Sequence, residues 1–427
     1  MSKQKVNVIF SEVLSRIKPS GSELKEIKES LKIFLDKLEA NRKRLKIDAQ
    51  IFIGGSFAKN TLVKKDKYDI DVFVRFDKRY DDKNLSELTE KILRGFNSER
   101  IHGSRDYFKI NVSENLFFEV VPVKKISTSR EAVNITDLSY YHVKYVNKKI
   151  KNEKILDDIM LAKAFCEGAR CYGAESYING FSGYGLELLI YHYKRFMNFV
   201  KAMTKVKNKV VIDLEKHHKK TSQILMDLNS AKLESPIVMI DPTEKQRNVL
   251  AALSEETFSR FQNHCKSFLK DPTIDFFERQ DLDMEFLKQE AKKKRQDFLV
   301  IEVKTNKQSG DVAGSKLLKF YKTIQREISR FFEVKKSEFE YLDEGQTAKY
   351  FFIVKSKKEI LIVGPRIKNV KHVKRFKVKH KKTFVKNGRI CVKLKVKENL
   401  AQFITNWKKK NQKIMSDMSI GGLTTHG

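Results

Sequence analysis

Two aspartates and a short glycine-rich turn are the residues whose types and spacing could do chemistry in this 427-residue chain. Asp69 and Asp71 lie in the run 68–76, where the flanking residues Ile70 and Val72 are apolar. Side chains two positions apart on a strand share a face, so the two carboxylates should emerge side by side. Adjacent carboxylates repel each other unless a cation joins them. The pattern therefore predicts a cation site on this strand.

The turn Gly54-Gly55-Ser56 follows a predicted strand over residues 50–53. Its glycines would let the backbone approach a ligand closely, and the Ser56 hydroxyl and the amides of the turn could hold a phosphate. A phosphate on one side and a carboxylate pair on the other is the geometry that holds magnesium between a protein and a nucleoside triphosphate. A glycine-rich turn alone is usually only a turn, and a carboxylate pair alone is usually a solvated strand face. Their combination favours a role in binding a metal ion and a nucleotide.

The order of these features resembles the polymerase-β-like nucleotidyltransferases, and the finer strings 54–61 and 69–73 resemble the archaeal-type (class I) CCA-adding enzymes, which are tRNA nucleotidyltransferases. That family needs a third carboxylate on a later strand, and Glu119 supplies one within the run 116–122. The family pattern usually has Asp at this position and often Glu-x-Asp at the first pair, so the longer side chain of Glu119 is a departure. The resemblance implies that Asp69, Asp71 and Glu119 are catalytic and bind two Mg²⁺ ions.

Later segments resemble the same family and imply a nucleotide pocket. They are residues 137–142, where Tyr140 replaces a family proline, 161–165, 172–175, 180–184, 187–189 and 240–249. The nucleotide-binding residues implied by this resemblance are Gly55, Ser56, Lys59, Ser139, His142, Lys163, Tyr172 and Arg247. Among them, Lys163 would pair with triphosphate oxygens, Tyr172 would contact the sugar or phosphates, and Arg247 would contact the incoming nucleotide.

Each of these assignments has a structural alternative. His142 could be a half-buried structural histidine, and Lys163 a solvated helix residue. Tyr172 could fill a core, and Arg247, expected in a segment that leads into a helix ending near residue 269, could bond only to neighbouring loops.

The composition favours a folded protein with a polyanionic partner. Hydrophobic residues make up 41% of the chain, and 87 Lys and Arg against 54 Asp and Glu give a formal charge of +33. Such an excess of positive charge favours nucleic acid. The sequence has no apolar run long enough to span a membrane and no signal-peptide pattern, so a cytoplasmic location is expected. The four cysteines lack a Cys-x-x-Cys pair, so we expect reduced packing residues rather than a zinc site.

The periodicity predicts an α+β fold with three domains. Residues 1–142 would form the nucleotidyltransferase catalytic head, with helices 5–17 and 21–45 covering a small mixed sheet of strands 50–53, 68–76, 107–112 and 116–123. Residues 143–272 would form a helical nucleotide- and tRNA-binding central domain, with helices over 155–172 and 181–200. Residues 273–427 would form an α+β tRNA-binding body and tail with a strand over 297–303, a helix over 314–332 and a β-hairpin of residues 349–355 and 359–363.

A strongly basic segment near the C-terminus predicts an RNA-binding surface. Residues 366–397 contain 14 Lys and Arg and no Asp or Glu, and lysines alternate with apolar residues after the turn Asn387-Gly388. This indicates a hairpin with one buried and one lysine-covered face, which would dock RNA phosphates; the alternative is a solvated face. The candidate RNA-binding residues are Lys374, Arg375, Lys377, Lys379, Lys393 and Lys395. Residues from 416 onward are small and polar, and we expect them to be mobile.

Together these features predict template-independent addition of CCA to the 3′ end of tRNA from CTP and ATP by two-metal nucleotidyl transfer, with the tRNA acceptor arm as partner. Three alternatives remain open: a poly(A)-adding enzyme, a single-nucleotide terminal transferase, or a catalytically silent RNA-binding homologue. A homodimer is compatible with the sequence, which does not fix the oligomeric state.

Overall fold

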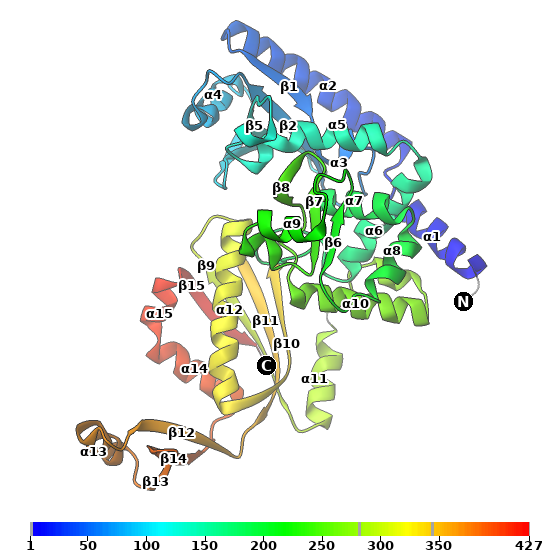
Figure 1. Ribbon diagram of the computed structural model, residues 1–427. Helices are drawn as coiled ribbons and strands as arrows, with labels where there is room; N and C mark the ends of the chain where they lie inside the picture. Colours follow the sequence, from blue (N-terminus) through cyan, green and yellow to red (C-terminus); the bar gives the residue numbers. More distant parts are fainter. Residues whose placement is uncertain (1–2, 281–282, 343–345, 427) are drawn as a thin grey trace. The chain divides into compact units, whose positions relative to one another are not determined.

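The computed structural model describes residues 3–280, 283–342 and 346–426, and the chain forms two compact units, residues 1–280 and 281–427 (Figure 1). Within the described ranges no helix is both long and apolar enough to cross a membrane. The mixed α+β class agrees with the prediction. The finer division of the first unit near residue 142 stays a prediction.

A five-stranded mixed sheet forms the head of the first unit, in the order β1-β2-β5-β4-β3. β2 runs parallel to β5, and the other neighbours are antiparallel. The strands are β1 (Ala49–Ile53), β2 (Tyr68–Phe76), β3 (Ser98–Ile101), β4 (Tyr107–Ser113) and β5 (Leu116–Lys124). The predicted small mixed sheet is confirmed, and β3 is an additional edge strand.

Only one of the two N-terminal helices covers this sheet. The apolar face of α2 (Gly21–Arg44), which includes Ile27, Leu31 and Leu38, belongs to the same core as the even-numbered residues of β2. In contrast, Ile9 and Val13 of α1 (Lys3–Ile17) pack in a second core with α6. The expectation that both helices cover the catalytic sheet is therefore wrong for α1. The short helices α3 (Gly55–Ala58) and α4 (Leu85–Ile92) complete the head.

The second core of this unit is helical and rich in aromatic rings. Phe165, fully buried, contacts the rings of Phe196, Phe261 and Phe268 from two other helices. The helices around it include α5 (Ser139–Lys149), α6 (Glu153–Gly168), α7 (Gly183–Tyr193), α8 (Phe196–Met203) and α10 (Glu255–Lys270). Cys166, Cys171 and Cys265 are buried here as free thiols, as expected of packing residues.

Two features of this region differ from the predictions. The single helix expected over residues 181–200 is two helices, because Lys194 adopts a left-handed conformation (φ 68°) that ends α7. The region also contains a three-stranded sheet, β6-β7-β8, that helical periodicity did not predict. Its strands are β6 (Val210–Asp213), β7 (Ile237–Asp241) and β8 (Glu244–Asn248), accompanied by α9 (Thr221–Asp227).

The second unit contains two sheets. The larger has the order β10-β11-β9-β15, and the smaller has the order β12-β14-β13. Their strands are β9 (Asp297–Thr305), β10 (Phe332–Leu342), β11 (Thr347–Ser356), β12 (Glu359–Arg366), β13 (Thr383–Lys386), β14 (Arg389–Lys395) and β15 (Ile420–His426). The helices are α11 (Met284–Lys293), α12 (Asp311–Phe331), α13 (Val370–Lys379), α14 (Leu400–Lys410) and α15 (Gln412–Asp417).

The structure corrects two predictions about this unit. Residues 349–355 and 359–363 do not form a hairpin, because β11 pairs with β9 and β10 while β12 pairs with β14. The C-terminal segment is not a mobile end. Ile420 and Leu423 are buried, and β15 adds an edge strand to β9.

The basic segment contains the predicted hairpin and an additional helix. β13 and β14 pair across Asn387-Gly388, and Lys393 and Lys395 are exposed on β14 while Ile390 and Val392 are buried. The other four candidate RNA-binding residues lie on the exposed helix α13 rather than on the hairpin: Lys374, Arg375, Lys377 and Lys379. Figure 1 shows α13 and the smaller sheet together as an extension of this unit.

Candidate active site

Parallel pairing of β2 with β5 brings the predicted acids together. Asp71 lies directly opposite Glu119 in the register, and Asp69 lies opposite Phe117. Neighbouring strands are about 4.8 Å apart, so the Asp71 and Glu119 side chains stand next to each other on one face of the sheet. Asp69 emerges from the same face two residues earlier along β2. The three carboxylates therefore share one end of this face.

These carboxylates disfavour each other's ionisation. Burial raises the pKa of Asp71 to about 6, and the charge of Asp69 adds to this effect. Burial raises the pKa of Glu119 to about 7, and the charges of Asp71 and Asp69 raise it further. Lys65 partly offsets this repulsion because its Nζ lies 3.1 Å from Asp69 Oδ1. The site thus concentrates negative charge that a divalent cation would neutralise.

The donor set fits Mg²⁺ that is shared with a ligand. Among the residues that the structure describes, no group of three or more His, Cys, Asp or Glu side chains is arranged to hold a metal ion by itself. Mg²⁺ in nucleotide sites, however, is usually held by one or two carboxylates together with substrate phosphates and water. Facing carboxylates of Asp71 and Glu119, with Asp69 beside them, suit this mode of binding.

The glycine turn lies directly against Asp71. Gly54 N donates to the Asp71 carbonyl oxygen at 2.9 Å. A Cβ at Gly55, whose φ is +60°, would lie 1.7 Å from Asp71 Oδ2, and a Cβ at Gly54 would lie 2.2 Å from the Phe73 ring. Neither position can carry a side chain unless the Asp71 carboxylate or the Phe73 ring moves. Ser56 follows in α3, so the structure brings the predicted phosphate turn and the acids together.

A buried glutamate joins two of the predicted phosphate-binding lysines. Glu187, fully buried on α7, lies 2.6 Å from Lys59 Nζ and 3.6 Å from Lys163 Nζ. Lys163 Nζ also donates to the carbonyl oxygen of Thr61 at 2.9 Å, and Thr61 Oγ1 donates to Glu187 at 3.1 Å. Lys163 is 4% exposed, so the alternative of a solvated helix residue is wrong.

Burial has the largest single effect on the pKa values of Lys163 and Glu187. It lowers the pKa of Lys163 to about 8, although the charge of Glu187 opposes the shift. Burial also opposes ionisation of Glu187, but the charges of Lys59 and Lys163 hold the pKa of its carboxyl below the usual value. With both lysines protonated, one carboxylate faces two ammonium groups, and the group keeps an excess of positive charge. Such an excess is suited to a triphosphate.

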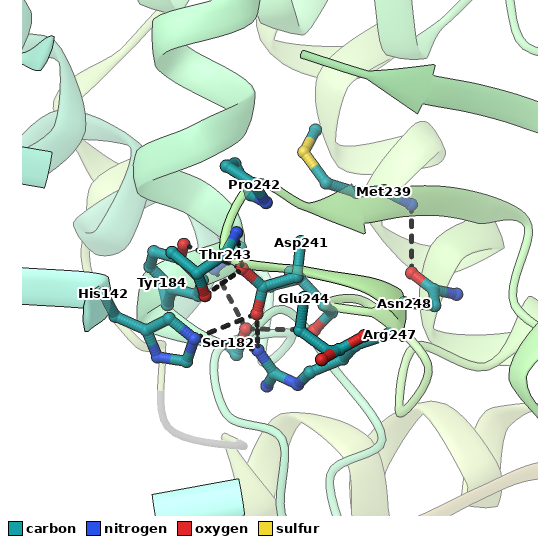
Figure 2. A network of polar contacts seen from close by, with 12 residues as sticks. His142, Ser182, Tyr184, Met239, Asp241, Pro242, Thr243, Glu244, Arg247 and Asn248 are labelled. Carbon is teal, nitrogen blue, oxygen red and sulfur yellow. Dashed lines mark hydrogen bonds and ion pairs between the residues drawn. The ribbon is translucent and has the colours of Figure 1, made fainter. Parts of the chain in front are cut away.

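A second cluster forms around Asp241, which is fully buried (Figure 2). His142 Nε2 lies 2.9 Å and Arg247 Nη1 lies 2.6 Å from Asp241 Oδ2, and the Tyr184 hydroxyl donates to Oδ1 at 3.3 Å. The rings of His142 and Tyr184 stack with their centroids 4.1 Å apart. Thus His142 and Arg247, far apart in the sequence, meet through one carboxylate.

The Asp241 cluster contains one buried donor that lacks an acceptor. Burial lowers the pKa of His142 despite the nearby Asp241, which favours the neutral ring. Burial opposes ionisation of Asp241, but the hydrogen bond with His142 and the charge of Arg247 hold its pKa far below the usual range. Arg247 Nε is buried and donates to no acceptor in the described part of the chain. Buried donors without an acceptor are rare in folded proteins, which makes Arg247 a candidate ligand-binding residue.

The position of Arg247 differs from the expectation. It lies on β8 rather than in a segment entering a helix, because Asp241 Oδ1 accepts from Thr243 N at 2.8 Å and helps to close the turn between β7 and β8. The helix α10 begins only at Glu255.

The remaining predicted nucleotide residues line the same region. Ser139 begins α5, one turn before His142. A Cβ at Gly183 would lie 3.1 Å from the Tyr172 hydroxyl and 4.0 Å from Lys163 Cε, so these two side chains flank Gly183. Lys59 Nζ lies 5.8 Å from the centre of the Tyr184 ring, and its charge lowers the pKa of Asp71. Lys59 therefore interacts with Asp71 and with Tyr184 of the Asp241 cluster, in addition to its ion pair with Glu187.

Sequence reasoning assigned no role to Glu187 or Asp241. The available signal was a charged residue inside an apolar run: Glu187 interrupts the sequence from Leu186 to Ile190, and Asp241 ends the apolar strand β7. A charge in such a place needs a buried partner.

Two family models match consecutive parts of the chain. The model described as "Nucleotidyltransferase domain" matches residues 31–160, and the model described as "tRNA nucleotidyltransferase, second domain" matches residues 157–278. These ranges include the acids, the lysine pair and the Asp241 cluster.

Several curated relatives are named "CCA-adding enzyme". The chain is 38% identical to the one from Nanoarchaeum equitans over 49% of this chain and 52% of that protein. It is 28% identical to the one from Methanocaldococcus jannaschii over 90% and 86% of the two chains, and 31% identical to the one from Sulfurisphaera tokodaii over 63% and 60%. The match thus spans about half the length of the first relative and most of the second.

Solved structures of similar fold include the Cid1 poly(U) polymerase. One such structure aligns with a TM-score of 0.51 and 15% identity, covering 65% of this chain and all of that chain. At this identity the likeness concerns the fold alone.

Glu187→Gln should destabilise the protein by about 3–5 kcal/mol, because the substitution leaves two buried ammonium groups without their carboxylate. Urea unfolding would measure the loss. A matched control is Glu29→Gln, which breaks an exposed pair with Lys25 at 3.9 Å and should cost less than about 1 kcal/mol. Equal effects of the two substitutions would contradict the role of Glu187 as the buried counter-charge.

Proposed function

The chain belongs to the tRNA nucleotidyltransferase family, and from this premise we propose that it adds CCA to the 3′ end of tRNA from CTP and ATP without a template. The observation that carries the proposal is the pairing of Asp71 with Glu119 beside the Gly54-Gly55 turn. This arrangement offers carboxylates and a phosphate-binding turn to the same ligand.

The proposed reaction is an in-line substitution at the α-phosphorus of the nucleotide. The 3′-oxygen of the RNA forms a new bond to that phosphorus while the bond to pyrophosphate breaks, and the hydroxyl proton is released. Two Mg²⁺ ions held by Asp69, Asp71 and Glu119 would lower the pKa of the hydroxyl and offset the charge of the phosphates. The protein contributes orientation, because substrates held in reacting geometry no longer pay the entropy of encounter.

The lysine pair and the turn would hold the triphosphate. Lys59 and Lys163 share only one carboxylate, so positive charge remains for phosphate oxygens. The hydroxyls of Ser56 and Ser139 can donate to the same oxygens. Tyr172, which flanks Gly183 beside Lys163, would contact the sugar or phosphates.

The Asp241 cluster would face the nucleotide with a guanidinium and an imidazole. Asp241 engages one side of Arg247 through Nη1, while Nε lacks a protein acceptor. A planar guanidinium fixed in this way can donate to a base edge or to phosphate. We assign Arg247 and His142 to the incoming nucleotide.

The second unit would bind the tRNA acceptor arm by its phosphates. The exposed basic residues of α13 and β14 are the candidates named above, and such contacts position RNA without reading its sequence.

One incorporation assay separates this proposal from its alternatives. The protein is incubated with tRNA lacking its CCA end, Mg²⁺ and each labelled nucleotide in turn. Incorporation of CMP from CTP followed by AMP from ATP supports CCA addition. Incorporation of AMP alone indicates a poly(A)-adding or single-nucleotide transferase. No incorporation indicates a silent RNA-binding homologue, although the intact Asp69 and Asp71 pair argues against that outcome.

Asp71→Ala should reduce incorporation by roughly 10²-fold or more, since losing one electrostatic group of the transition state has effects of this size. The affinity for tRNA, measured by filter binding, should stay nearly unchanged. Asp66→Ala is the matched control, because Asp66 is an exposed acid in the loop before β2. Substantial residual turnover of the Asp71 variant would refute the metal assignment.

Glu119→Asp should keep incorporation within about tenfold of wild type, because it retains the carboxylate that Mg²⁺ requires. Glu119→Gln keeps the length of the side chain and loses the charge, so its rate should fall as far as that of Asp71→Ala. If the Asp variant were inactive and the Gln variant active, length rather than charge would be the requirement.

The affinity for CTP should fall as pH rises through about 8, because Lys163, whose pKa is about 8, then becomes neutral in the free protein and must regain a proton to bind phosphate. The fall should approach tenfold per pH unit above 8. Equilibrium binding without tRNA would measure it. Lys163→Arg should flatten this dependence, since a guanidinium stays protonated. An unchanged slope in that variant would show that another group titrates.

A further inference from the structure

A cavity of about 430 Å³ lies in the second unit, away from every residue assigned above except Lys395. It is lined by the end of α12, the start of β10, the paired strands β12 and β14, and α14. Its volume falls in the range of pockets that bind small organic groups. It forms where the smaller basic sheet meets the aromatic core of the larger sheet.

Aromatic rings form the apolar part of this cavity. Phe403 is half-buried, and its ring centroid lies 5.0 Å from that of Phe331 and 5.5 Å from that of Phe332. Phe332 and Trp407 are almost fully buried, whereas Phe331 and Phe403 keep exposed ring surface. Ile360 and Leu394, a directly paired couple of β12 and β14, complete the apolar lining. The lining therefore offers flat apolar surface to a ligand.

Cations dominate the polar part of the lining. It contains Arg330, Lys395, Lys397 and Lys410 but only two carboxylates. Both carboxylates are engaged, since Glu327 pairs with Arg330 at 3.1 Å and Glu398 accepts from Asn406 at 3.1 Å.

Three of these cations make no ion pair among the described residues, and Glu398 is the one carboxylate of the lining that is not paired with Arg330. In the described part of the chain, the ammonium groups of Lys395, Lys397 and Lys410 make no ion pair, and all three side chains are exposed. Free positive charge beside a partly exposed aromatic surface suits a ligand that is both planar and anionic.

We propose that this cavity binds one unstacked nucleotide of the RNA, with the base against Phe403 and Phe331 and the adjoining phosphates on Lys395, Lys397 and Lys410. The inference deepens the proposed function by adding a contact to an RNA base where only phosphate contacts were assigned. Aromatic side chains bind bases through their π-faces, and neighbouring lysines neutralise the backbone. Lys395 belongs both to the cavity and to the candidate RNA-binding surface of β14, so the two surfaces are continuous.

A protein segment is a less suitable occupant. An apolar peptide side chain could fill the aromatic part, but it would leave three ammonium groups without partners. A segment of RNA satisfies both parts, because each base is flanked by phosphates.

The test compares RNA with and without a base. The full-length protein is titrated with a single-stranded RNA hexamer carrying 2-aminopurine at its centre, with the same hexamer made abasic at that position, and with a fully paired duplex. We expect the wild type to bind the 2-aminopurine hexamer about five- to a hundredfold more tightly than the abasic one, which is the usual effect of one stacked base. Binding should change the fluorescence of the probe.

Two substitutions assign this preference to the cavity. Phe403→Leu keeps an apolar side chain in the core but removes the ring, and it should abolish the preference without weakening binding to the duplex. Phe384→Ala is the control, because Phe384 is 39% exposed on β13, outside the cavity, and its loss should leave all three affinities unchanged. Lys410→Gln should weaken binding to all three probes, since it removes only a phosphate contact.

Either of two results would overturn the proposal. One is equal affinity of the wild type for the abasic and 2-aminopurine hexamers, and the other is an undiminished preference in Phe403→Leu. If Phe403→Leu keeps the preference and binds every RNA as tightly as wild type, a protein partner becomes the better candidate for the cavity.

The incorporation assay separates this test from the proposed function. If wild type adds nucleotides but shows no base preference, only the cavity proposal fails. If it adds none but shows a preference that depends on Phe403, the cavity stands and the catalytic proposal fails.

Discussion

Repulsion between carboxylates on paired strands is the constraint on which the site depends. The parallel register of β2 and β5 puts Asp71 beside Glu119, and burial then raises the pKa of both. A protein gains no stability from such an arrangement. Binding of a divalent cation and an anionic ligand would offset the repulsion between the carboxylates, so these ligands would stabilise the site. The glycine turn fits this requirement, because the backbone of Gly54-Gly55 carries no side chains and lies directly against Asp71.

Buried counter-charges organise the remainder of the site in the same way. Glu187 holds Lys59 and Lys163, and Asp241 holds His142 and Arg247. Each cluster joins segments that are far apart in sequence. Fixing long cationic side chains before the ligand arrives reduces the entropy that binding would otherwise cost. The positions of these cations are therefore determined by residues that need not touch the substrate.

The sequence alone predicted the features that a pattern of neighbouring residues determines. Alternation along residues 68–76 placed Asp69 and Asp71 on one face, and the family resemblance located Glu119, His142, Lys163 and Arg247. It was insufficient where tertiary partners decide the outcome. Helical periodicity continues through Lys194, yet the chain turns there, and β11 and β12 look like a hairpin but pair with different strands. Glu187 and Asp241 were missed because the partners of a buried charge lie outside any sequence window. The cavity beside Phe403 has no sequence signal, since its lining comes from five separate elements.

Binding of Mn²⁺, a paramagnetic substitute for Mg²⁺, tests the central claim most directly, because it reports on the carboxylates without requiring turnover. Electron paramagnetic resonance would count bound Mn²⁺ in the wild type and in Asp71→Asn, each with and without CTP. The account predicts weak binding to the free protein, clearly tighter binding when CTP is present, and loss of that enhancement in the variant. Equal Mn²⁺ binding by the two proteins in the presence of CTP would contradict it.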